Sequence, residues 1–244
     1  MGRVRRCWPL RVVAELASRR GVRAAGDELG MVASVGLSSD GSVIWLCGGP
    51  SSGKSSIARA IQRLGAIDDA WLHAGDEHLL RQVPSGLVVT AEPTGDPGGD
   101  QRGWFVPVRD GVIVGRPRVG PLALRVLDGM YRAVAGLAAA GNNVVLDDVV
   151  WDRDVAALAL NALRDTAVLM VHIECALATS LARERARPDR LDGAVTAYAG
   201  GPRVLENFDL AVDTTSQVAS ECAAAVVERW RQSRHGTAMQ RLAD

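Results

Sequence analysis

Short apolar runs alternate with amphipathic stretches along most of the chain. Runs typical of strands buried in a parallel sheet lie at 42–47, 71–74, 143–147, 167–173 and 210–212. Stretches with the spacing or composition of helices lie at 57–64, 121–140, 152–163, 176–186 and 218–231. This alternation predicts an α/β fold with a mainly parallel central sheet that helices cover on both faces.

Residues 85–120 interrupt the alternation, because they are rich in glycine and proline. Within them, Asp110-Gly111 lies between extended segments at 104–108 and 112–114, and Asp-Gly in such a setting is a hairpin signal. We therefore expect a surface excursion that contains a hairpin and forms a flap over a substrate. Outside the core domain at 39–233, we predict an N-terminal extension at 1–38 and a C-terminal tail at 234–244.

Composition and charge narrow the class of protein. Hydrophobic residues make up 48% of the 244, which is typical of an ordered globular protein, and the formal net charge is zero, which argues against a nucleic-acid partner. No apolar run reaches the roughly 18 residues needed to cross a bilayer, so we expect no membrane partner. Scattered cysteines without metal-ligand spacing are typical of a cytoplasmic protein with reduced thiols: Cys7, Cys47, Cys175 and Cys222.

The segment after the first predicted strand fits the pattern G-x-x-x-x-G-K-S at every position. It reads Gly48, Gly49, Pro50, Ser51, Ser52, Gly53, Lys54 and Ser55, and Ser56 follows it at the start of an amphipathic helix. In a P-loop of this kind, backbone N–H groups surround the β-phosphate of ATP at a helix N-terminus. The lysine reaches the β- and γ-phosphates, and the hydroxyl after it binds Mg²⁺. The motif therefore predicts ATP and Mg²⁺ as cofactors.

Lysine occurs only once in the chain, at position 54. Every other cationic side chain among the 28 lysines and arginines is an arginine. Arginine cannot replace a compact ammonium where a point charge must lie deep in a phosphate site. A chain that uses lysine only in the P-loop therefore indicates that this position requires it.

Acidic residues follow two of the predicted strands. Asp147 and Asp148 end the third strand, and Asp76 and Glu77 follow the second, so all four lie at the edge of a parallel sheet where ligands bind. One of the first pair is a candidate Mg²⁺ ligand, and one of the second pair is a candidate base that accepts the proton of a hydroxyl acceptor. Strand-end acids also favour the start of a following helix, which is the structural alternative for both pairs.

Arginines are concentrated after the fourth strand and its helix. Arg183 and Arg187 share a helical face at i, i+4, and Arg190 follows them. Arginines in a lid would bind the phosphates and neutralise the charge that develops during phosphoryl transfer. The alternative is a solvated helix end, where cations are ordinary.

Together these motifs resemble the chloramphenicol phosphotransferase family of P-loop small-molecule kinases over about residues 42–231. The ordered series that carries the resemblance is Gly-Gly-Pro-Ser-Ser-Gly-Lys-Ser at 48–55, Trp-Leu-His-Ala-Gly-Asp-Glu at 71–77, Leu-Asp-Asp-Val at 146–149, Arg-Glu-Arg-Ala-Arg-Pro-Asp-Arg at 183–190, Ala-Tyr at 197–198 and Val-Asp-Thr-Thr at 212–215. The resemblance implies a P-loop kinase-like three-layer fold with an Arg-rich lid. It also implies ATP-dependent transfer of the γ-phosphoryl group to a hydroxyl of an antibiotic, giving resistance or self-protection.

The resemblance leaves the base open between two residues. Matching the family pattern without a gap places Glu77 at the family's catalytic aspartate, whereas Asp76 has the right residue type one position earlier. Pro50 replaces a small polar residue of the family, and the excursion at 85–120 is longer than the family's.

Two other functions are compatible with the motifs. One is a kinase for a metabolite such as a nucleoside, a sugar acid or a nucleotide. The other is an ATP-binding regulatory module without catalysis, although such a module needs neither the acids nor the lid arginines. The expected partner is a small hydroxylated acceptor, and the sequence is compatible with a homo-oligomer.

Overall fold

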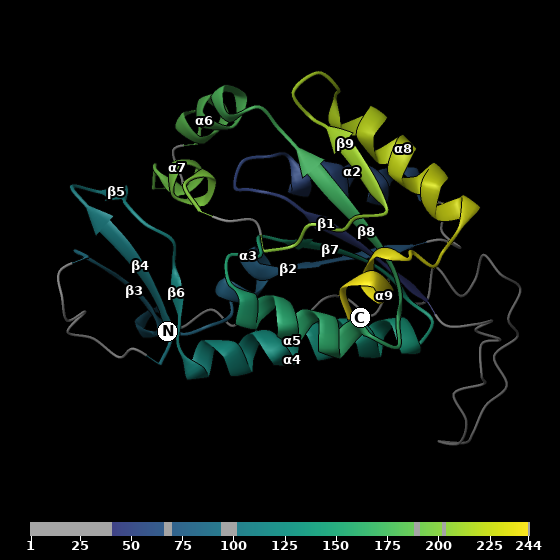
Figure 1. Ribbon diagram of the computed structural model, residues 1–244, viewed down its shortest axis with the longest axis horizontal. Helices are drawn as coiled ribbons and strands as arrows, with labels where there is room; N and C mark the ends of the chain where they lie inside the picture. Colours follow the sequence, from purple (N-terminus) through teal and green to yellow (C-terminus); the bar gives the residue numbers. More distant parts are fainter. Residues whose placement is uncertain (1–40, 66–69, 94–101, 188–190, 202–203, 244) are drawn as a thin grey trace, which may run out of the picture. The chain divides into compact units, whose positions relative to one another are not determined.

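The computed structural model describes residues 41–65, 70–93, 102–187, 191–201 and 204–243 (Figure 1). The chain divides into two units, Met1–Leu37 and Ser38–Asp244, and the described residues all belong to the second. The N-terminal extension predicted at 1–38 lies outside the described residues, so it stays a prediction.

The described core contains a five-stranded parallel sheet, as the sequence predicts. Its strand order is β2-β7-β1-β8-β9, with β1 in the centre. Because the chain moves from β1 to one side for β2 and β7 and to the other side for β8 and β9, the order reverses at β1. In open α/β sheets, ligands bind at the carboxyl end of such a switch point. The strands are β1 (Ser42–Cys47), β2 (Trp71–Gly75), β7 (Asn143–Asp148), β8 (Ala167–Glu174) and β9 (Leu210–Asp213).

Helices cover both faces of the sheet, which makes the fold three-layered (Figure 1). All of β1 is buried, and its alternate side chains pack on opposite layers. Ile44 and Leu46 pack in the cluster with helices α2 and α8, and Val43 and Trp45 pack in the cluster with α4 and α5. These helices are α2 (Lys54–Leu64), α4 (Pro121–Ala139), α5 (Arg153–Leu163) and α8 (Ala219–Gln232).

The excursion forms a small separate sheet. Strand β4 (Trp104–Arg109) pairs antiparallel with β5 (Val112–Ile113), which confirms the predicted hairpin. Asp110 and Gly111 have φ angles of 50° and 77°, as a tight hairpin turn requires. The sequence did not predict β3 (Val88–Ala91), parallel to β4, or β6 (Arg118–Val119), antiparallel to β4.

The remaining described elements are short. They are α3 (Asp76–Leu80), a 3₁₀ turn (Ser85–Leu87), α6 (Leu177–Arg185), α7 (Ala194–Ala199) and α9 (Ala238–Ala243). The prediction of a tail at 234–244 missed α9, which begins where Asp209 Oδ1 accepts hydrogen bonds from the N–H groups of Thr237 and Ala238. Ala238 is buried in the core, so this end of the chain packs on the domain. No helix in the described part of the chain has the length and apolarity of a membrane span.

Candidate active site

The P-loop joins β1 to α2 through a backbone that ordinary side chains rarely adopt. Ser51 and Gly53 have φ angles of 56° and 99°, in the left-handed region, and α2 begins at the next residue, Lys54. A Cβ at Gly49 would lie 2.9 Å from a ring carbon of Tyr198, so a larger residue would push that ring away from the loop. Lys54 is buried, and its Nζ donates a hydrogen bond to the Gly49 carbonyl at 2.9 Å. The loop itself therefore holds the ammonium in a defined place.

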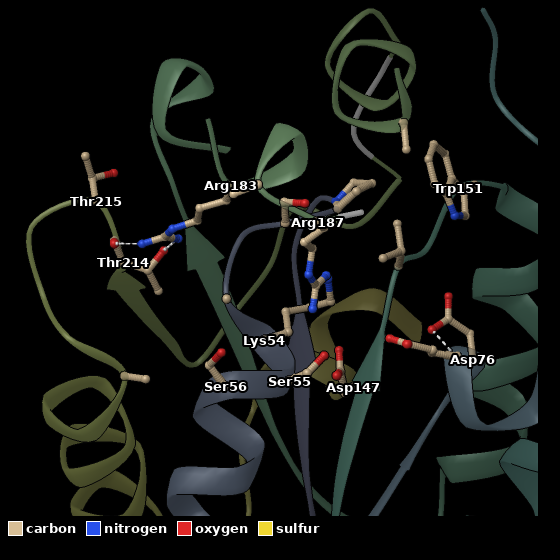
Figure 2. A pocket seen from close by; sticks show the side chains of 18 of the residues that line it. Lys54, Ser55, Ser56, Asp76, Asp147, Trp151, Arg183, Arg187, Thr214 and Thr215 are labelled. Atoms are coloured by element: carbon tan, nitrogen blue, oxygen red, sulfur yellow. Dashed lines mark hydrogen bonds between the residues drawn. The ribbon is translucent and has the colours of Figure 1, made fainter. Parts of the chain in front are cut away.

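A cavity of about 1000 Å³ opens at the carboxyl edge of the parallel sheet (Figure 2). The P-loop, α3, the end of β7, α6 and the segment after β9 all contribute to its lining. Most of the residues predicted from the sequence line it: Pro50, Ser51, Gly53, Lys54, Ser55, Ser56, Asp76, Glu77, Asp147, Arg183 and Arg187. The lining does not include Gly48, Gly49, Ser52 or Asp148. The predicted Arg190 lies outside the described residues.

Asp147 is the strand-end acid that faces the P-loop. Burial alone would raise the pKa of its carboxyl, but the His73 imidazole, the Lys54 ammonium and a hydrogen bond with Ser55 together hold it below its usual value. Figure 2 shows Ser55 and Asp147 close together beneath Lys54. A hydroxyl and an ionised carboxylate are the oxygen ligands that Mg²⁺ takes when nucleotide phosphates and water complete its shell. The described residues hold no cluster of three or more histidines, cysteines or acids for a metal.

Asp148 points to the opposite face of the strand, as adjacent residues must. Its Oδ2 accepts a hydrogen bond from the buried Tyr131 hydroxyl at 2.5 Å, and its side chain is buried against α4. Burial is the main cause that raises its pKa, to about 6. Of the two acids predicted as candidate metal ligands, only Asp147 therefore lines the cavity with Ser55.

Asp76 and Glu77 begin α3 and point in different directions. Glu77 Oε1 accepts from Arg81 Nη2 at 3.0 Å, and the Glu77 side chain is 39% exposed. Asp76 Oδ1 accepts from the Glu77 N–H at 2.7 Å (Figure 2). Desolvation, followed by the charge of Asp148, raises the pKa of Asp76 to about 8, and Lys54 opposes this effect. A carboxyl whose pKa lies near physiological pH can both take up and release a proton there, which suits it to proton transfer.

The raised pKa of Asp76 has a consequence for stability in the absence of nucleotide and metal. The folded protein keeps a proton on Asp76 up to about pH 8, whereas the unfolded chain releases it near 3.8. Stability from this site is therefore fully present below the unfolded pKa and is lost as the pH rises towards 8. Replacing the carboxyl by a neutral amide removes this loss.

We expect Asp76→Asn, in EDTA, to raise Tm by about 3 °C or more near pH 8, with a smaller gain near pH 5. One pKa unit is about 1.4 kcal/mol, and 1 kcal/mol moves Tm by about 2–4 °C in a domain of this size. Thermal unfolding, monitored by circular dichroism between pH 5 and pH 8, measures this difference in Tm. Glu77→Gln is the matched control and should follow the wild-type profile. Identical pH profiles for Asp76→Asn and wild type would show that Asp76 is not desolvated.

Arg183 and Arg187 face different parts of the cavity (Figure 2). Arg183 donates to the Thr214 carbonyl at 2.7 Å and to its hydroxyl at 3.0 Å, and Thr214 Oγ1 donates to the Ser52 carbonyl at 2.6 Å. Arg183 is thus fixed between the P-loop and the segment after β9. Arg187 points into the cavity on the side of Lys54.

A second, smaller pocket adjoins the cavity. Its volume is about 100 Å³, and its walls come from α3, the small sheet, α4, α5 and the loop after β7. Five residues line both the pocket and the large cavity: Asp76, Leu80, Pro117, Val149 and Trp151. The other lining residues are Leu79, Val88, Trp104, Val106, Val119, Leu127, Asp148 and Val155, so the pocket is apolar except for two acids.

Sequence reasoning missed Trp151, Thr214 and the apolar pocket. Thr214 belongs to the Val-Asp-Thr-Thr segment that carries the resemblance, so it was available as a signal. Trp151 comes four residues after Asp147 and carries no motif of its own. Its place at the junction of the two cavities depends on the fold.

Comparison with known proteins identifies the family. Residues 41–231 match the profile of the chloramphenicol phosphotransferase-like proteins. The chain belongs to this family. Proteins from two strains of Mycobacterium tuberculosis, which carry the provisional name of O-phosphotransferase, are 28% identical over 204 residues, 83% of this chain and 88% of theirs. The resemblance inferred from the motifs is therefore confirmed.

Solved structures confirm the fold class. An APS kinase of Mycobacterium tuberculosis, solved with AMPPNP and APS, has a TM-score of 0.52 and 16% identity, covering 79% of this chain and 98% of that one. A sugar kinase from a Janibacter species has a TM-score of 0.52 and 13% identity, covering 80% and 96%. At this identity the likeness concerns the fold, which is that of the P-loop kinases. The family and this fold together identify the chain as a kinase-type phosphotransferase.

Proposed function

We propose that this member of the chloramphenicol phosphotransferase-like family transfers the γ-phosphoryl group of ATP to a hydroxyl of a small acceptor that carries an apolar group. An antibiotic or related natural product fits this description, and its phosphorylation would give resistance or self-protection in the cytoplasm, where ATP is available. The observation that carries the proposal is the position of Asp76, which lines both the P-loop cavity and the apolar pocket.

The P-loop side of the cavity would hold the nucleotide. Lys54 and the amides at the start of α2 would bind the phosphates, and Arg183 with Thr214 would fix the opposite end of the site. Ser55 and Asp147 would hold Mg²⁺, which when bound supplies charge neutralisation for the phosphates. Arg187, on the side of Lys54, would bind the transferring phosphoryl group and neutralise its developing charge.

Asp76 would act as the base. In its ionised form, its carboxylate would accept the proton of the acceptor hydroxyl as the oxygen attacks the γ-phosphorus of ATP and ADP leaves. Glu77 is the weaker candidate, because its carboxylate pairs with the exposed Arg81. This proton acceptor beside the phosphate site also favours a kinase over a regulatory module, which needs no such group.

The apolar pocket favours one class of acceptor over another. None of the pocket-lining residues in the described part of the chain is a lysine or arginine, and the two ionisable side chains among them are the acids Asp76 and Asp148. A carboxylate or phosphate on the acceptor would lose its hydration there without a counter-charge. A compact apolar group would instead gain about 25 cal/mol per Å² of area that it buries. An uncharged acceptor is therefore favoured over a sugar acid or a nucleotide.

An acceptor panel tests the proposal. We expect ATP-dependent phosphorylation of at least one neutral, hydroxylated, partly apolar compound from a set of phenicols and other natural products, and no turnover of sugar acids or nucleotides. Mass spectrometry of the product identifies the phosphorylated hydroxyl, and Lys54→Ala protein is the blank. A clear preference for an anionic acceptor would overturn the proposed acceptor class, and nucleosides in the same panel test the metabolite alternative.

A further inference from the structure

Arg116, in the loop between β5 and β6, joins three segments that are far apart in the sequence. Its Nη1 donates to the Trp151 carbonyl at 3.1 Å, and its Nη2 donates to the Tyr198 carbonyl at 2.9 Å. Its guanidinium also lies over the Tyr198 ring, 5.4 Å from the centroid. One half-buried side chain thus connects the excursion, the loop after β7 and α7.

The segments that Arg116 joins also contact one another. The Tyr198 and Trp151 rings meet edge to face with centroids 5.4 Å apart. The Ile113 N–H donates to the Asp192 carbonyl at 2.7 Å, which attaches the hairpin to the chain just before α7. Gly193 follows with a φ of 100°, and a Cβ there would overlap the Ile113 carbonyl. These contacts make the hairpin and α7 one continuous wall.

This wall extends from the apolar pocket, proposed for the acceptor, to the P-loop, proposed for the nucleotide. Trp151 lines the apolar pocket and the large cavity, whereas the Tyr198 ring lies against Gly49 of the P-loop. The buried Glu184 of α6 accepts from the N–H groups of Gly193 and Val195, so α7 is also tied to the helix that carries Arg183. The two ends of the site are thus linked through α7.

We infer that Arg116 is a positioning residue: its two hydrogen bonds and its cation–π contact with Tyr198 hold Trp151 at the apolar pocket in a fixed position relative to the P-loop. A planar guanidinium suits this task, because it offers two N–H groups in a fixed fork and a face that stacks on an aromatic ring. A lysine supplies the charge without the fork. The expected effect of an Arg116 substitution on acceptor kinetics rests on the proposed function. The expected effect on the hydrogen exchange of the wall does not.

The first experiment is hydrogen–deuterium exchange, which needs no acceptor. In Arg116→Ala we expect faster exchange in three separate segments, 112–119, 149–152 and 193–200, with β1 and β8 unchanged. Gly201→Ala should reproduce this pattern, because a Cβ at Gly201 would overlap the Arg116 guanidinium. Arg118→Ala is the matched control, since Arg118 stacks on Phe105 within the small sheet at 4.4 Å. A change confined to 112–119, or no change, overturns the inference.

The second experiment uses the acceptor that wild-type protein phosphorylates. We expect Arg116→Ala to lower kcat/KM for the acceptor on the order of 10–100-fold, with KM for ATP changed less than about twofold. Arg116→Lys should recover only a small part, and Arg118→Ala should match wild type. Equal loss for acceptor and ATP, or full recovery in Arg116→Lys, overturns the positioning role. If wild-type protein phosphorylates no compound, the proposed function fails, and the exchange data still decide whether Arg116 holds the wall.

Discussion

Lys54→Ala and Lys54→Arg are both expected to lower phosphoryl transfer by on the order of 10²–10³-fold or more while the fold survives. Lys54 is buried, and its ammonium donates to the Gly49 carbonyl inside the loop. An arginine at this position would have to fit a planar fork where the loop surrounds a single nitrogen. Loss of the ammonium also removes the cation that favours ionised Asp76 and Asp148.

Transfer of labelled phosphate from ATP to the acceptor, with Tm from circular dichroism, measures both parts of this expectation. Arg59→Ala is the control, because Arg59 lies on the exposed side of the same helix and should have no effect on either quantity. Near wild-type turnover in Lys54→Arg would show that charge alone suffices. The single lysine of the chain would then be a coincidence of composition.

The sequence predicted the parts of this fold that local pattern determines. The apolar runs gave all five strands of the parallel sheet, since strands buried on both faces need continuous apolar residues. The P-loop was predicted because glycine, lysine and serine at these fixed spacings are the residues that bind phosphates and Mg²⁺. Strands β3 and β6 were missed because strands of four and two residues acquire their hydrogen bonds only from β4, through the tertiary fold.

The candidate site also has parts that local sequence pattern predicts and parts that depend on tertiary contacts. Residues that follow strands were predicted to meet at the sheet edge, and Asp76, Asp147 and Lys54 do line one cavity. The bridge made by Arg116, Trp151 and Tyr198 was not predicted, because its three members are distant in sequence and only the folded chain brings them together. Periodicity and motifs carry no signal for such contacts.

The choice between Asp76 and Glu77 shows why one residue of register matters. Gap-free spacing favoured Glu77, and residue type favoured Asp76. In the structure, α3 begins at Asp76 itself, so successive side chains differ by about 100° around the helix axis. The first carboxylate therefore lies near Asp147 and Asp148, and the second reaches Arg81 one turn later. The sequence could not give the residue at which this helix starts.

Asp76→Asn is expected to lower kcat by about 10²–10⁴-fold, the usual contribution of a general base, while Glu77→Gln stays within a few-fold of wild type. Both variants should bind ATP as wild type does, because neither carboxyl belongs to the P-loop, and calorimetric titration with a non-hydrolysable ATP analogue measures this. The stability test above separates the two roles of Asp76, since the same substitution should stabilise the fold as it removes catalysis. Loss of turnover in Glu77→Gln with activity kept in Asp76→Asn would assign the base to Glu77. Full turnover in both would leave catalysis to positioning and to charge neutralisation by Lys54, Mg²⁺ and Arg187, with no protein base.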